Sequence, residues 1–162
     1  MIKKLSFLSL VVLLFVSCDK TPITVATCTY TPSTLKADTA EVRYLRNYLI
    51  ANSITATEDT SGYFYNFSAV GSGTSPTICS TVLVQYTGWL LQSNFKFDES
   101  TSGAALKLGL VIEAWQKVVP TMKPGGIVTI YVPPSLAYAA GGSGSIPPNS
   151  YLKFYIKLVA VQ

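Results

Sequence analysis

The chain has 162 residues, the length of one ordinary domain with some additional sequence. Hydrophobic residues make up 49% of it, which is enough for a substantial core, and the formal net charge is +4. The absence of histidine excludes histidine-based catalytic triads, histidine-ligated zinc sites and histidine proton shuttles. No run of basic residues suited to a phosphate backbone is present, so nucleic acid is not an expected partner.

Residues 1–17 have the organisation of a signal peptide. Lysines precede an apolar stretch at residues 5–16, which is shorter than the roughly 20 residues that a membrane-spanning helix needs. Cys18 follows a small residue, and this arrangement resembles the lipobox of bacterial lipoproteins, although Phe15 stands where leucine is usual. A plain secretory signal with an unrelated cysteine is the alternative. We expect lipidation of Cys18 and a protein anchored to a bacterial membrane in the cell envelope, facing the periplasm or the cell exterior.

Residues 18–35 are rich in Thr, Pro and Ser and show no sustained period, which is typical of a tether. Once Cys18 is lipidated, Cys28 and Cys79 remain. In an exported protein these two cysteines either form a disulfide or remain separate thiols, and the sequence leaves both alternatives open.

Residues 36–60 are predicted to form a helical extension. Asp38 followed by Glu41 resembles a capping box at the start of a helix. The apolar residues of this helix recur at helical spacing, at Val42, Leu45 and Leu49. This stripe indicates that the helix packs either on its own domain or on a second copy of the chain in a homodimer.

Residues 61–162 are predicted to form the main domain, where the pattern changes to the period of two typical of strands. The predicted strands cover residues 62–67, 81–91, 127–132 and 151–161. Strands with one polar face indicate an antiparallel sheet. Between the second and third of these strands, the residues around Trp115 suit a short helix that ends near Pro120. The predicted fold class is therefore α+β, with a strongly twisted antiparallel sheet and one short helix.

The main domain carries no nucleophile elbow, phosphate-binding loop or metal-ligand cluster, so we expect neither a metal nor a cofactor. Six of its segments instead occur in a specific order. They are V-Q-Y-T-G-W-L at 84–90, F-D-E-S at 97–100, V-I-E-A-W at 111–115, M-K-P-G-G at 122–126, A-Y-A at 137–139 and I-P-P-N-S-Y-L-K-F at 146–154. Each alone is weak, but together they resemble the FKBP-type peptidyl-prolyl cis-trans isomerases over residues 62–162.

This resemblance implies a half-barrel sheet wrapped around the short helix, with a proline-binding pocket between them. Trp115 would form the floor of the pocket. The other substrate-binding residues would be Tyr86, Phe97, Val111, Ile112 and Phe154 in the walls, and Ile146 at the tip of a loop over the site. The catalytic residues would be Tyr138, whose hydroxyl would donate to a substrate carbonyl, and Asp98, beside the rotating amide. The backbone N–H of Ile112 would be a second donor.

The activity implied is cis–trans isomerisation of Xaa-Pro bonds in exported proteins, with proline-containing polypeptides as partners. The barrier of ~18–20 kcal/mol comes from amide resonance. A twisted amide has lost that resonance and its carbonyl is less polar, so a dry apolar pocket favours the twisted state. This chemistry requires no nucleophile, metal or proton carrier.

A prolyl-peptide-binding or chaperone module without catalysis is the alternative function. Some positions depart from the pattern in ways that favour it. Ala104 stands where the family often has a pocket aromatic, and Ala114 and Ala139 stand where it usually has glycine. If either of the latter positions needs a positive φ, an alanine there is strained.

Overall fold

The computed structural model describes residues 28–162, so the predicted signal peptide and Cys18 lie outside the described residues. The helices and strands are α1 (Thr39–Ala51), β1 (Thr57–Glu58), β2 (Phe64–Ala69), β3 (Thr81–Leu90), β4 (Lys96–Lys107), α2 (Glu113–Val118), β5 (Ile127–Val132) and β6 (Leu152–Val161). Short 3-10 helices are η1 (Leu108–Leu110), η2 (Val119–Thr121), η3 (Pro134–Leu136) and η4 (Ala139–Gly141).

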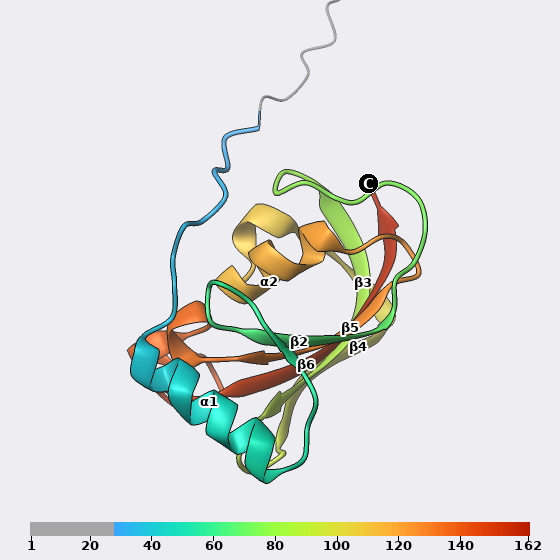
Figure 1. Ribbon diagram of the computed structural model, residues 1–162. Coiled ribbons are helices and arrows are strands. Elements are labelled where there is room, and N and C mark those ends of the chain that lie inside the picture. The colour runs from blue at the N-terminus through green and yellow to red at the C-terminus, as the bar shows by residue number, and fades with distance from the viewer. Residues whose placement is uncertain (1–27) are drawn as a thin grey trace, which may run out of the picture.

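The strands form one antiparallel sheet in the order β1-β2-β5-β6-β3-β4. The pairing of β3 with β4 shifts register between Val84 and Tyr86 and again between Gly88 and Trp89. Such bulges bend a strand and increase its twist. The sheet accordingly curves around α2 (Figure 1), and the predicted α+β fold is confirmed.

The concave face of the sheet holds the main core. Alternate residues of the central strands are fully buried there, namely Val82, Val84, Val128, Ile130, Ile156 and Leu158. They pack with Ala114, Trp115 and Val118 of α2. Fully burying one such side chain contributes roughly 1.5–3 kcal/mol relative to leaving it in water. This packing fixes α2 against the sheet.

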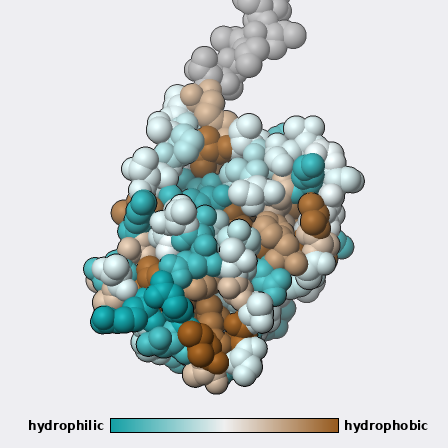
Figure 2. All heavy atoms as spheres, in the orientation of Figure 1, coloured by the Kyte–Doolittle hydropathy of each residue, from teal (hydrophilic) through white to brown (hydrophobic). Residues whose placement is uncertain are grey.

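The convex face holds a second cluster beneath α1, on the other side of the sheet from α2 (Figure 1). The predicted stripe of α1 packs there on the domain's own residues Phe64, Leu91 and Tyr131. The stripe is therefore covered within the chain itself, which favours the first of the two alternatives that the sequence left open. The outward side of α1 carries polar residues over part of its length (Figure 2), and its exposed large hydrophobic residues are Tyr44 and Ile50.

Polar contacts hold α1 at its start and in its middle. The Asp38 carboxylate accepts from the backbone N–H of Ala40 at 2.7 Å and caps the helix. Glu41 does not complete a capping box, because its Oε2 accepts from Oγ of Ser135 at 2.6 Å and from the Ser135 N–H at 3.1 Å. Arg46 forms an ion pair with Glu58 of β1 at 2.7 Å. The cap at Asp38 is confirmed, and Glu41 instead joins α1 to η3.

The long strand β4 and the short strand β1 are not among the predicted strands. The middle of β4 runs Glu99-Ser100-Thr101-Ser102-Gly103, which is mostly small and polar and has no apolar alternation. As the edge of the sheet, β4 pairs only with β3, so its hydrogen bonds rather than its burial fix it as a strand. Within residues 28–162, no helix is both long enough and apolar enough to cross a membrane.

The described part of the predicted tether lies against the domain. Cys28 forms a disulfide with Cys79, with a Cα–Cα distance of 5.7 Å, so the disulfide alternative is confirmed. Lys117 of α2 donates from Nζ to the carbonyl oxygen of Ser33 at 2.7 Å. Residues 28–38 therefore connect the disulfide to α1 along a fixed path.

Candidate functional site

A pocket of about 280 Å³ opens between α2 and the concave face of β3, β4 and β6. Its lining consists of Tyr86, Phe97, Asp98, Leu106, Leu110, Val111, Ile112, Trp115, Tyr138 and Phe154. Most of these side chains are apolar or aromatic, and the polar groups are few. An apolar hollow with a small number of converging polar groups is the usual form of a binding site for a small ligand or side chain.

Aromatic rings form the interior of this pocket. Trp115 of α2 is 4% exposed and contacts the rings of Tyr86 and Phe154 at centroid distances of 5.3 and 5.5 Å. Phe97 in turn contacts Phe154 at 5.6 Å. All three pairs are edge-to-face, a preferred geometry that fixes each ring through its neighbours. The pocket is therefore shaped before a ligand enters.

Gly88 of β3 makes room for two of these rings. A Cβ atom added at Gly88 would lie 2.6 Å from the ring of Phe97 and 2.9 Å from that of Phe154. Real Cβ atoms do not approach other atoms so closely, so a larger residue would displace the rings. The glycine in the segment at residues 84–90 thus serves the packing of the pocket wall.

The polar groups of the pocket are hydroxyls around a carboxylate. Tyr86 donates from its hydroxyl to Oδ2 of Asp98 at 2.6 Å. Burial, followed by this bond and the charge of Asp98, raises the pKa of Tyr86 to about 12. Burial and then the Asp98 charge also raise the pKa of Tyr138 above its usual value. Both hydroxyls therefore keep their protons at neutral pH and remain donors.

Two N–H groups of the pocket have no acceptor within residues 28–162. The indole Nε1 of Trp115 is buried without a hydrogen-bond partner there. Ile112 is the N-cap residue of α2, and its backbone N–H likewise donates to no described group. Buried donors are normally paired, so the indole Nε1 of Trp115 is an exception. The N–H of the half-buried Ile112 is left for a ligand or water to pair.

The structure brings together the predicted residues Tyr86, Phe97, Asp98, Val111, Ile112, Trp115, Tyr138 and Phe154. Ile146 is the exception. It is 6% exposed, belongs to the main core cluster and does not line the pocket. Backbone bonds between Ser143 and Ile146 in both directions, at 2.8 and 2.9 Å, fold the loop back. The loop buries this side chain, and its place at the tip of a loop over the site stays a prediction.

Leu106 and Leu110 line the pocket but were not predicted. The alternation of Leu106, Leu108 and Leu110 is a strand-like signal in the sequence, although it does not show which leucine faces a pocket. Ala104 lies opposite Val84 in the sheet and does not line the pocket. Leu106 is the apolar residue that β4 contributes to the wall.

The two alanines at expected glycine positions differ in conformation. Ala139, directly after Tyr138, has φ of 46°, in the left-handed region that disfavours side chains. Ala114 lies within α2, where alanine is favourable. Of these two alanines, only Ala139 is therefore strained, and it directly follows Tyr138 of the pocket.

Residues 28–162 contain no group of three or more His, Cys, Asp or Glu side chains placed to hold a metal ion. The residues that line the pocket offer binding in an apolar hollow combined with hydrogen-bond donation.

Residues 73–159 match the family model of FKBP-type peptidyl-prolyl cis-trans isomerases. The peptidyl-prolyl cis-trans isomerase Mip of Coxiella burnetii is 41% identical over 106 residues, covering 63% of this chain and 46% of that protein. The isomerase FkpA of Escherichia coli K12 is 37% identical over 106 residues, covering 64% of this chain and 39% of that protein. The chain thus spans less than half the length of these curated relatives.

Solved structures show the same fold. The crystal structure of FkpA from Escherichia coli has a TM-score of 0.67 at 29% identity, covering 76% of this chain and 58% of that chain. A peptidyl-prolyl cis-trans isomerase from Pseudomonas syringae has a TM-score of 0.66 at 29% identity, covering 78% of this chain and 98% of that chain.

Proposed function

Because this chain belongs to the FKBP-type peptidyl-prolyl cis-trans isomerase family, we propose that it accelerates rotation about Xaa-Pro bonds in exported polypeptides. The observation that carries the proposal is the pocket itself. It combines an aromatic interior of about 280 Å³ with two donors, the Ile112 N–H and the Tyr138 hydroxyl, that bond to no group within residues 28–162. Proline-containing polypeptides are the proposed partners.

In the proposed mechanism the proline ring lies on Trp115 and is enclosed by the side chains of Phe97, Val111 and Phe154. This holds one side of the rotating bond. The planar amide loses part of its hydration on entering, whereas the twisted amide, with its less polar carbonyl, loses less. The pocket therefore binds the twisted state better than the planar one, which is the condition for acceleration.

The polar groups add to this preference. The Tyr138 hydroxyl and the Ile112 N–H donate to substrate carbonyls, and donors aimed at the rotated rather than the planar carbonyl lower the barrier. Asp98, held by Tyr86, lies beside the amide and favours the more electrophilic carbonyl carbon of the twisted state. One hydrogen bond stronger by about 1.4 kcal/mol in the transition state corresponds to about tenfold in rate.

The proposal includes the location of the protein. Lipidation at Cys18 would anchor the chain to a bacterial membrane in the cell envelope, with the domain facing the periplasm or the exterior. The support is the sequence of residues 1–18 and the disulfide at Cys28, since disulfides are typical of oxidising compartments. A homodimer through α1 is not proposed, because the domain itself covers the apolar stripe of that helix.

The test is the cis-to-trans relaxation of a short Xaa-Pro peptide in the presence of the chain from Asp19 onward. Strong acceleration that falls in Tyr138→Phe and Trp115→Ala supports the isomerase. A matched control is Tyr155→Phe, which alters a tyrosine on the convex face of β6. If a folded wild-type chain binds prolyl peptides without accelerating the relaxation, the isomerase proposal fails and the chain is a prolyl-peptide-binding module.

A further inference from the structure

The short helix η1 carries one wall of the pocket. Its last residue, Leu110, lines the pocket although it is 68% exposed, and Val111 and Ile112 follow directly. Leu108 at the start of η1 is fully buried in the main core, whereas the exposed Leu110 at its end has little such support. The position of the end of η1 therefore also depends on the segments that contact the helix from outside the pocket.

One of these contacts is the ring of Tyr30 on Gly109. A Cβ atom added at Gly109 would lie 2.3 Å from Cγ of Tyr30, so the ring occupies the space that a side chain would need. Gly109 has no positive φ, and its backbone conformation is open to other residues. The tyrosine ring, rather than the backbone, is what requires glycine here.

The second contact comes from the turn before β3. The backbone N–H of Leu108 donates to the carbonyl oxygen of Ser80 at 3.0 Å. Two bonds between Thr77 and Ser80 close this turn, one from the Thr77 N–H to Ser80 Oγ and one from the Ser80 N–H to the Thr77 carbonyl, each 3.0 Å. The turn is thus a fixed support for the start of η1.

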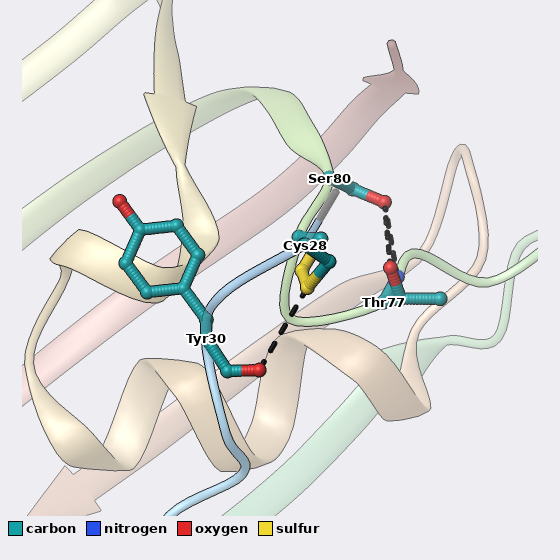
Figure 3. Close-up of a disulfide and its surroundings, with 5 residues drawn as sticks. Cys28, Tyr30, Thr77 and Ser80 are labelled. Atoms are coloured by element: carbon teal, nitrogen blue, oxygen red, sulfur yellow. Dashed lines mark hydrogen bonds between the residues drawn. A yellow bond between two sulfur atoms is a disulfide. The ribbon is translucent and has the colours of Figure 1, made fainter. Parts of the chain in front are cut away.

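The disulfide joins the two supports. Cys28 stands two residues before Tyr30, and Cys79 directly precedes Ser80 (Figure 3). The bond from Lys117 of α2 to Ser33 holds the same segment on its other side. Tyr30, at 37% exposed, therefore lies on η1 within a segment that is fixed on both sides of it.

We propose that Tyr30 is a positioning residue for the pocket, acting through η1, and that the Cys28–Cys79 disulfide holds it there. The inference rests on the proposed function, because the pocket wall that Tyr30 supports is the wall that would enclose proline. Tyr30 and Cys28 lie outside the matched residues 73–159, so this support is an addition to the family domain.

The first test compares KM and kcat for an Xaa-Pro peptide in the full chain and in Tyr30→Ala, Tyr30→Phe and the double variant Cys28→Ser/Cys79→Ser. The expected result is a KM raised about three- to tenfold in Tyr30→Ala and in the double variant. Tyr30→Phe keeps the ring and is expected to restore the wild-type KM. Tyr44→Ala is the matched control, because Tyr44 is a half-exposed tyrosine on the convex face that stacks on Tyr151. An unchanged KM in folded Tyr30→Ala overturns the proposal.

The second test is a double-mutant cycle with Gly109→Ala. The added Cβ collides with the Tyr30 ring, so Gly109→Ala is expected to raise KM when Tyr30 is present and to have little further effect in Tyr30→Ala. Equal effects of Gly109→Ala in both backgrounds contradict the contact. Since Gly109→Ala keeps the disulfide, this cycle remains decisive if the cysteine variant folds poorly.

The third measurement separates this proposal from the proposed function. Backbone amide chemical shifts of Leu110, Val111 and Ile112 report the position of the wall without any substrate. They are expected to move in Tyr30→Ala and not in Tyr44→Ala. If the wild type does not isomerise but these shifts move, the proposed function fails and the positioning role stands. If the shifts do not move, the positioning role fails whatever the activity.

Discussion

The two faces of the sheet both bury aromatic rings, but they differ in whether their polar groups are hydrogen-bonded. On the convex face, Tyr48 donates from its hydroxyl to the carbonyl oxygen of Leu91 at 3.0 Å, and Glu41 is bonded to Ser135. On the concave face, Trp115 Nε1 and the Ile112 N–H have no partner among the described residues. The polar groups named on the convex face are paired within the protein, whereas these two donors on the concave side pair with no described group.

The difference shows how to distinguish a site from a core within one domain. Aromatic density alone does not do so, because Phe64 and Tyr131 on the convex face are as buried as Phe154 on the concave one. An unpaired buried donor costs about 1–3 kcal/mol, so a fold retains such groups where a ligand pairs them. Among the described residues, the open volume and the two unpaired donors lie together beside α2.

The largest expected effects come from truncating one buried residue on each face. Trp115→Ala is expected to cost about 3–5 kcal/mol of stability and to abolish isomerisation, and Leu45→Ala on the convex face about 2–5 kcal/mol. Activity per folded molecule should be unchanged in Leu45→Ala, because α1 does not line the pocket. Urea denaturation and peptide relaxation measure the two properties, and a loss of activity in both variants would erase the distinction between the faces.

Removing one tyrosine hydroxyl from each face is expected to affect activity on the concave face and stability on the convex face. Tyr138→Phe is expected to lower kcat/KM about tenfold, equivalent to one transition-state hydrogen bond, with stability within about 0.5 kcal/mol of the wild type. Tyr48→Phe loses the bond to Leu91 and is expected to cost about 1 kcal/mol of stability at unchanged kcat/KM. Comparing kcat/KM with the urea midpoint for each variant checks the pair. A loss of stability in Tyr138→Phe would indicate that the Tyr138 hydroxyl stabilises the fold rather than the transition state.

The pH dependence of stability at high pH follows from partly buried tyrosines such as Tyr86. The pKa of Tyr86 is raised to about 12 from 10.0, so the unfolded chain loses this proton at lower pH than the folded chain. Between these values the folded state binds more protons, and the free energy of unfolding falls as pH rises. The contribution is fully present below pH 10. Urea denaturation from pH 9 to 12 is expected to show a shallower fall in Tyr86→Phe, and an identical slope would contradict the raised pKa.

The smallest expected effects come from replacing Ala139 or Ala114 with glycine. The two substitutions are expected to change the free energy of unfolding in opposite directions. Ala139→Gly relieves the positive φ and is expected to stabilise the chain by about 0.5–1 kcal/mol. Ala114→Gly introduces glycine into α2 and is expected to destabilise it by about 1 kcal/mol. Thermal unfolding of the two variants measures both. Destabilisation by Ala139→Gly would mean that the strain there is absent in solution.

Much of the site follows from the sequence, because local patterns and motif order carry it. The burial of Val42, Leu45 and Leu49 follows from helical spacing. Eight of the ten pocket residues follow from the family resemblance that the six segments carry. Two features could not be predicted from local patterns: the burial of Ile146 and the formation of strand β4. The burial of Ile146 depends on a loop that folds back, and β4 forms because β3 pairs with it. Neither the folding of the loop nor the pairing with β3 can be predicted from the residues next to Ile146 or within β4.

The sequence by itself determined the α+β class, the central strands, the short helix and the types of residue in the pocket, because periodicity and motif order are properties of the chain. Tertiary structure alone decided that the stripe of α1 packs on its own sheet, that Cys28 and Cys79 come within bonding distance, and that Tyr30 lies on Gly109. These are contacts between residues far apart in the chain. Their energies depend on distances that only the folded chain sets.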